Sequence, residues 1–219
     1  MAKTRTLVRS AQLPLILVTG FKPFGVFKVN PTEGLIMTLA DHPGLVKRAS
    51  VVPVVLPTGY RASEREIARL LKKLNPDAVI SFGLNFGASK IMLERIAVNI
   101  DDANRPDNAR ETRQGTLIVP DGQAAYWSTL PLDALHKALN KAGLPAGYSN
   151  HAGTYVCNHL FYCCRHIIEA CGLKSRSGFI HMPPLPEQTT ESSPVTGMNA
   201  EDQLAGAVTI IETVARYCR

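Results

Sequence analysis

The sequence lacks a long apolar run, and this absence excludes a membrane-spanning helix. Its apolar stretches fall far short of the roughly 20 residues that such a helix needs. The chain also lacks a long Pro/Ser-rich linker, an internal repeat and a low-complexity tract, so we expect a single domain over residues 14–219. Residues 1–13 carry three basic residues, no acidic residue and no apolar core of a secretory signal. We expect a flexible basic arm there, with a short transit peptide as the alternative.

Disulfide and zinc frameworks are absent as well. The five cysteines are odd in number and lie in the last third of the chain, which fits a reducing, cytoplasmic setting. The cysteines and histidines of this region lack the paired C-x2-C and H-x3-5-H spacings of zinc sites, so we predict no metal. The residues concerned are Cys157, His159, Cys163, Cys164 and His166.

A basic patch is the third missing feature. The formal net charge is +6, but the basic residues are dispersed along the chain and are not interleaved with aromatic residues. This distribution is typical of a solvated surface, and we predict no nucleic-acid partner.

What the sequence does contain is an alternation of apolar strands and amphipathic helices. This order predicts an α/β/α sandwich with a mostly parallel sheet, in which functional groups gather at the carboxyl ends of strands. In particular, the strand, helix, strand order over 51–82 predicts a parallel pair with a right-handed crossover. The predicted strands are 15–18, 51–56, 78–82, 91–100, 116–119 and 178–182, and the predicted helices contain residues 31–39, 67–74, 132–142, 157–171 and 201–218.

Cys157 stands where polar turn residues give way to a helical pattern. Apolar residues then recur at steps of three and four until Gly172, so Cys157 lies in the first turn of a predicted helix. Unpaired N–H groups and the positive end of the helix dipole favour a thiolate there and can bind an oxyanion. We interpret Cys157 as a nucleophile. An inert core cysteine is the alternative.

Two further side chains have the chemistry to assist such a nucleophile. Glu94 shares an apolar strand face with Met92, where a carboxylate needs a hydrogen-bonding partner. An ion pair with Arg95 or exposure on an edge strand would also satisfy it. His181 lies near the end of a short strand, before a proline-rich stop. Together the three residues would supply a nucleophile, a base and an orienting carboxylate.

Phe21 and Phe24 lie in the loop after the first strand, bracketed by Gly20 and Gly25. Aromatic residues on a strand-end loop often line a ligand pocket, although these two could instead cover the core.

Four segments together resemble the pyroglutamyl peptidase I family of cysteine peptidases. In chain order they are TGFKPFG at 19–25, LERIAVN at 93–99, SNHAGTYVCNH at 149–159 and GFIHMPPLPEQ at 178–188. The resemblance implies a twisted central sheet, a Glu94, Cys157 and His181 triad, and removal of N-terminal 5-oxoproline from peptides. It also implies no cofactor, a cytoplasmic location and a homotetramer.

The resemblance also assigns a lactam pocket and shows three departures from the family. Phe21, Phe24, Tyr155 and Val156 match positions that line the pocket. Leu84 stands where the family has a polar glutamine. The oxyanion arginine is shifted by one place, so Asn104 and Arg105 are both candidate donors, and Phe27 replaces a smaller residue. We expect intact triad chemistry with altered or weakened specificity.

Two rival functions differ in class. A homologue could use the pocket to bind a lactam without turnover, which the retained triad disfavours. A nucleoside phosphorylase shares only the layered architecture, and the phosphate-binding loop it would need is not seen in the sequence.

Overall fold

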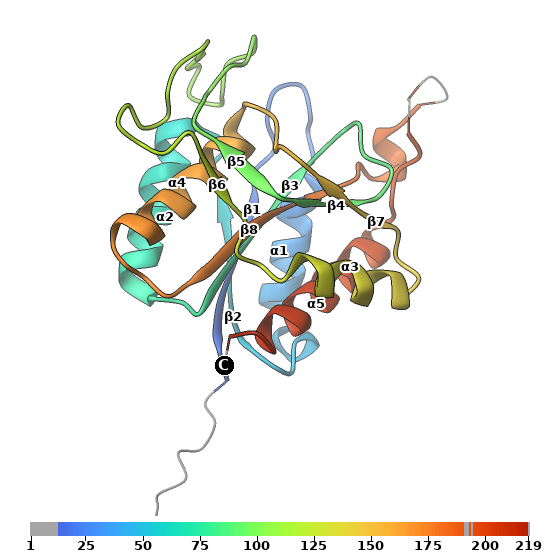
Figure 1. Ribbon diagram of the computed structural model, residues 1–219. Coiled ribbons are helices and arrows are strands. Elements are labelled where there is room, and N and C mark those ends of the chain that lie inside the picture. Colours follow the sequence, from blue (N-terminus) through green and yellow to red (C-terminus); the bar gives the residue numbers. More distant parts are fainter. Residues whose placement is uncertain (1–12, 191–192, 194, 219) are drawn as a thin grey trace, which may run out of the picture.

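A six-stranded sheet lies between two layers of helices in the computed structural model, which describes residues 13–190, 193 and 195–218 (Figure 1). The strand order is β2-β1-β3-β8-β4-β7. All neighbouring strands run parallel except β4 and β8, which are antiparallel. The strands are β1 (Leu15–Phe21), β2 (Ser50–Leu56), β3 (Ala78–Leu84), β4 (Ile91–Glu94), β7 (Ala146–Ser149) and β8 (Arg176–Met182).

Alternating side chains of the strands point into two separate cores. Ile16 packs with helices α1, α3 and α5, whereas the next residue, Leu17, packs with α2 and α4. This period of two is the expected behaviour of strands buried on both faces. The helices are α1 (Pro31–Asp41), α2 (Tyr60–Leu74), α3 (Leu132–Lys141), α4 (Val156–Ala170) and α5 (Ala200–Ala215). The predicted α/β/α sandwich is therefore confirmed.

Local sequence signals place the ends of several helices correctly. The Asn30 side chain accepts a hydrogen bond from the Thr32 N–H before α1, and Asn199 accepts one from Asp202 before α5. Gly172 follows α4 with φ of 62°, a conformation that glycine adopts without strain. The positive-φ residue thus closes the helix that carries Cys157.

The prediction of one continuous strand over 91–100 is wrong. The chain leaves the large sheet at Arg95, whose N–H donates to the Ser149 carbonyl and whose carbonyl accepts from Ser128. Strand β5 (Ile96–Val98) instead pairs with β6 (Ala125–Trp127) in a separate two-stranded sheet. Glu94 is consequently the last residue of β4.

One other strand prediction needs correction. Residues 116–119 form only one bridge, between Thr116 and Asp101, because the Val119 N–H donates to the Asn99 side chain instead of to a strand. Strands β2 and β3 are parallel as predicted, and β1 lies between them.

The predicted basic arm, residues 1–13, lies outside the described residues except for Leu13. Across the part of the chain that is described, every helix is too short or too polar to cross a membrane.

Candidate active site

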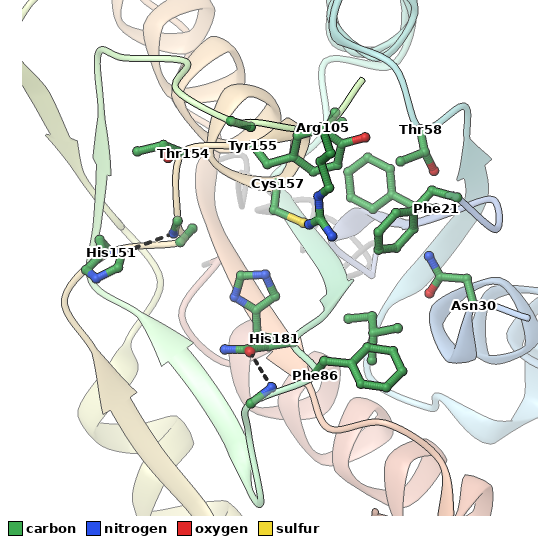
Figure 2. A pocket seen from close by; sticks show the side chains of 18 of the residues that line it. Phe21, Asn30, Thr58, Phe86, Arg105, His151, Thr154, Tyr155, Cys157 and His181 are labelled. Atoms are coloured by element: carbon green, nitrogen blue, oxygen red, sulfur yellow. Dashed lines mark hydrogen bonds between the residues drawn. The ribbon is translucent and has the colours of Figure 1, made fainter. Parts of the chain in front are cut away.

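A pocket of about 760 Å³ opens at the carboxyl ends of β1, β3 and β8, beside the first turn of α4 (Figure 2). Most of the residues that the sequence singled out line it. They are Phe21, Phe24, Leu84, Asn104, Arg105, Tyr155, Val156, Cys157 and His181. Glu94 lies behind His181, away from the pocket lining.

Cys157 is the second residue of α4 and is half-buried at the pocket wall. The loop before it is fixed by the Thr154 hydroxyl, which donates to the Asp102 carbonyl at 2.6 Å, and by the Tyr155 hydroxyl, which donates to the Pro106 carbonyl at 2.9 Å. The first N–H groups of a helix have no carbonyl partner within it. The Cys157 thiol therefore lies at the pocket wall beside backbone N–H groups that have no partner within α4.

The neighbouring thiols on α4 have a different environment. Cys163 and Cys164 are buried, and burial raises the pKa of the Cys164 thiol to about 12 and raises that of Cys163. A buried thiol with a raised pKa is a poor nucleophile. Of the cysteines in α4, Cys157 is the one that a substrate in the pocket can reach.

Glycine at position 83 lets the Cys157 side chain approach strand β3. A β-carbon at Gly83 would lie 2.7 Å from the Phe179 ring and 3.0 Å from the Cys157 sulfur. The first contact is too short for any side chain, and the second is tighter than most real contacts. Glycine at position 83 therefore lets α4 pack closely on the sheet at Cys157.

His181 links the pocket to the buried carboxylate of Glu94. Its Nδ1 lies 2.7 Å from Glu94 Oε1, and both side chains are buried. Burial alone would lower the pKa of His181, but hydrogen bonds with Cys157 and Glu94 and their charges raise it to about 9. The second Glu94 oxygen has no hydrogen-bond partner among the described residues, so the contact with His181 is the hydrogen bond that satisfies this buried carboxyl group.

The aromatic residues divide between the core and the pocket rim. Phe21 is buried and its ring centroid lies 6.3 Å from that of Phe179, so it serves both core and pocket. Phe24 is half-buried and lies 6.2 Å from Tyr155 and 5.4 Å from Phe27. The two alternatives for this loop, pocket lining and core covering, are therefore both realised.

Arg105 and Asn104 reach the pocket in different ways. The Arg105 guanidinium lies 4.4 Å from the centroid of the Tyr155 ring and 5.2 Å from that of Phe24, and its side chain projects into the pocket (Figure 2). The Asn104 side chain accepts a hydrogen bond from Gln114 at 3.1 Å. The arginine thus brings a positive charge to the pocket from its shifted position.

Sequence reasoning missed Phe86, which lines the pocket and stacks on Phe27 with ring centroids 4.3 Å apart. The signal was available, because Phe86 is an aromatic residue in a glycine-bracketed loop at a strand end, like Phe21 and Phe24. It also missed the partners of His159, whose Nδ1 lies 2.8 Å from a carboxylate oxygen of Asp101.

One known protein family matches nearly the whole chain. The sequence model of the pyroglutamyl peptidase family matches residues 15–217. The chain belongs to this family. A pyrrolidone-carboxylate peptidase of Ralstonia nicotianae is 44% identical over 204 residues, which are 93% of this chain and 94% of that protein. A second relative, from Caldanaerobacter subterraneus, is 39% identical and covers 92% of this chain and 98% of its own.

Solved structures of this family superpose closely on the chain. The crystal structure of pyroglutamyl peptidase I from Bacillus amyloliquefaciens has a TM-score of 0.88 at 35% identity, covering 93% of this chain and 97% of that one. A mutant pyrrolidone carboxyl peptidase from Pyrococcus furiosus has a TM-score of 0.87 at 37% identity, covering 94% and 100%. The resemblance expected from the four segments is thereby confirmed, and the family model matches residues 15–217.

Proposed function

We propose that this protein is a cysteine peptidase that removes an N-terminal 5-oxoprolyl residue from peptides. The proposal rests on one observation above all. Cys157 at a helix N-terminus and His181 at a strand end line one pocket, and the buried Glu94 lies 2.7 Å from the His181 ring. Membership in the pyroglutamyl peptidase family supports the choice of substrate.

The reaction follows from the positions of these groups. The Cys157 thiolate attacks the carbonyl carbon between the 5-oxoprolyl ring and the next residue, and the oxygen becomes an oxyanion. The carbon–nitrogen bond then breaks, the His181 imidazolium gives its proton to the leaving amine, and a thioester remains on Cys157. Water activated by His181 hydrolyses the thioester, which releases 5-oxoproline and restores the thiol.

Two groups are proposed to bind the oxyanion. The first is the backbone N–H of the opening turn of α4, which is directed toward the pocket end of the helix. The second is Arg105, because its guanidinium stacks on Tyr155, two residues before the nucleophile. We favour Arg105 over Asn104, because the guanidinium brings a positive charge into the pocket, whereas the Asn104 amide is neutral.

The pocket chemistry suits a small, flat and mostly apolar ring. Phe21, Phe24, Tyr155 and Val156 supply the apolar walls that we propose for the lactam. Leu84 is buried at the end of β3 and offers no hydrogen bond, so it leaves one polar group of the ring without a side-chain partner at this position. We therefore propose weaker lactam selectivity than a polar residue would give.

The alternative is a homologue that binds a lactam without turnover. The short contact between His181 and Glu94 argues against it, because a binding site has no need for a buried imidazolium beside a thiol. The architecture alone offers nothing further in favour of a nucleoside phosphorylase.

The deciding experiment measures release of a fluorophore from a 5-oxoprolyl amide. Wild type should turn it over, Cys157→Ala should not, and Cys171→Ala should behave as wild type because Cys171 is exposed at the far end of α4. A panel of amides with other N-terminal residues, including proline, runs beside it. If wild type cleaves neither the 5-oxoprolyl amide nor any member of the panel, the peptidase proposal fails and ligand binding without turnover takes its place.

We further propose that the protein works as a homotetramer in the cytoplasm and that residues 14–219 form its single domain. Free cysteines throughout the described residues support a reducing compartment. Exposed apolar side chains such as Trp127, at 66% exposure, supply surface that an assembly could cover. Light scattering on the purified protein tests the assembly.

A further inference from the structure

A second cluster of reactive side chains lies on the other side of α4 from the nucleophile. It consists of His159 and Cys163, which are one helical turn apart, and Glu64, which comes from α2. His159 is about 200° around the helix from Cys157. All three side chains lie outside the lining of the pocket, so the cluster has no part in the proposed peptidase chemistry.

The three ligand atoms of the cluster all lie within 4.8 Å of one another, and the two separations from His159 Nε2 are close to those of ligands that share one zinc ion. The Cys163 sulfur lies 3.6 Å from His159 Nε2. Two ligands at about 2.3 Å and 2.0 Å from a tetrahedral zinc would be about 3.5 Å apart. Glu64 Oε2 lies 3.7 Å from the same nitrogen, a few tenths of an ångström more than a tetrahedral nitrogen and oxygen pair requires. The Glu64 side chain is 48% exposed and can move by that amount.

His159 is already oriented as a metal-binding histidine is. Its Nδ1 lies 2.8 Å from Asp101 Oδ2, and the same oxygen accepts a hydrogen bond from Arg113 Nη1 at 2.8 Å. A histidine that binds a metal through one nitrogen usually donates its other N–H to a carboxylate in this way. The Asp101 contact therefore directs Nε2 toward Cys163 and Glu64.

Two carboxylates flank the proposed histidine ligand from opposite sides of its ring. Asp101 Oδ2 lies 2.8 Å from His159 Nδ1, and Glu64 Oε2 lies 3.7 Å from Nε2. A dication would replace the Nε2 proton and the Cys163 thiol proton, and both protons would go to solvent.

We propose that Cys163 Sγ, His159 Nε2 and the Glu64 carboxylate bind a zinc ion, with a water molecule as the fourth ligand. Thiolate, imidazole and carboxylate together suit zinc better than magnesium or calcium, which prefer oxygen ligands alone. The histidine and cysteine are buried, so the ion and its water would enter from the side of the half-exposed Glu64. The ion would join α2 to α4. This proposal does not depend on the peptidase activity.

Cobalt(II) is the probe, because a cobalt–thiolate bond gives a charge-transfer band and tetrahedral cobalt gives intense visible bands. The titration uses full-length Cys157→Ser protein, so that the pocket thiol cannot contribute. We expect one equivalent of cobalt to produce both bands and one equivalent of zinc to bleach them. The Cys163→Ser substitution in that background should remove the charge-transfer band, whereas Cys171→Ser should leave it unchanged.

A second pair of variants serves as a control, because Cys163 is buried and its substitution can also disturb folding. Glu64→Gln changes a half-exposed side chain and should weaken cobalt binding by at least about tenfold, since even partners that only orient a ligand contribute tenfold or more. Glu66→Gln on the same helix should have no effect. The proposal is overturned if no thiolate band forms, if the band survives Cys163→Ser, or if Glu64→Gln and Glu66→Gln bind cobalt as tightly as their parent.

Discussion

His181 and Glu94 meet diagonally across the antiparallel pairing of β4 and β8. The backbone of Glu94 lies opposite Phe179 and that of His181 lies opposite Met92, so the two side chains are neighbours on one face of the sheet. The carboxylate is thereby fixed to Nδ1 at 2.7 Å, and Nε2 is left as the ring nitrogen that can exchange a proton with the pocket. Because the carboxylate can only accept, Nδ1 carries a proton and donates it to Glu94.

We predict that Glu94→Gln lowers kcat by roughly 10²- to 10⁴-fold, as the loss of the orienting carboxylate does in related triads. The amide keeps the shape of the side chain but no longer stabilises the imidazolium. Steady-state hydrolysis of a 5-oxoprolyl amide checks this, with the exposed Glu187→Gln as the control. Near wild-type kcat in Glu94→Gln would show that Glu94 has only a packing role.

The pH dependence should show the raised pKa of His181, which is about 9. The imidazolium exists below this pH and is lost as the pH rises through it, so kcat/KM should fall on the alkaline side near pH 9. Glu94→Gln replaces one of the two groups that raise this pKa with a neutral amide. The alkaline fall in kcat/KM should therefore occur at lower pH in this variant. If kcat/KM falls at the same pH in both proteins, the fall arises from a group other than His181.

Arg105→Ala should reduce kcat/KM by roughly 10- to 100-fold, mainly through kcat, because it removes a charged donor for the oxyanion. Arg105→Lys should recover part of the loss, since lysine keeps the charge but cannot stack on Tyr155 as a planar group does. The exposed Lys28→Ala serves as the control for loss of a surface cation. An effect confined to KM would instead make Arg105 a substrate-binding residue.

Leu84→Gln should increase discrimination between a 5-oxoprolyl and a prolyl amide, which differ in the ring carbonyl. A hydrogen bond to a buried ligand group contributes about 1 to 3 kcal/mol, or roughly 5- to 150-fold. The ratio of the two kcat/KM values measures it. Leu84→Met, which keeps the volume and the apolar character, should leave the ratio near that of wild type.

Features set by neighbouring residues could be predicted from the sequence. The helix ends at Asn30, Gly172 and Asn199 follow local rules, and each lies where expected. The placement of Cys157 in a first helical turn also needed only the periodicity after it. Such signals act within a few residues, so no tertiary knowledge is required.

Features set by distant contacts could not be predicted. Strand 91–100 breaks because the Arg95 carbonyl accepts from Ser128 and the residues after it pair with β6, a segment far along the chain. Periodicity showed that Glu94 needs a partner, and residue chemistry made His181 a candidate, but the sequence does not show that two side chains 87 residues apart meet. Likewise, spacing rules look along one segment, and the possibility that His159 and Cys163 meet Glu64 arises only when α2 packs on α4.

The depth of Glu94 has a consequence for the medium in which the reaction runs. At 0% exposure this carboxylate is beyond the reach of mobile ions, whereas Arg105 is exposed at the pocket mouth. Dissolved salt screens exposed charges over about 8 Å at physiological ionic strength but acts little on buried ones. Changing the ionic strength would therefore distinguish the contributions of the two charges. Added salt would weaken the attraction between Arg105 and an arriving substrate, whereas the proton transfers at His181 would continue unchanged.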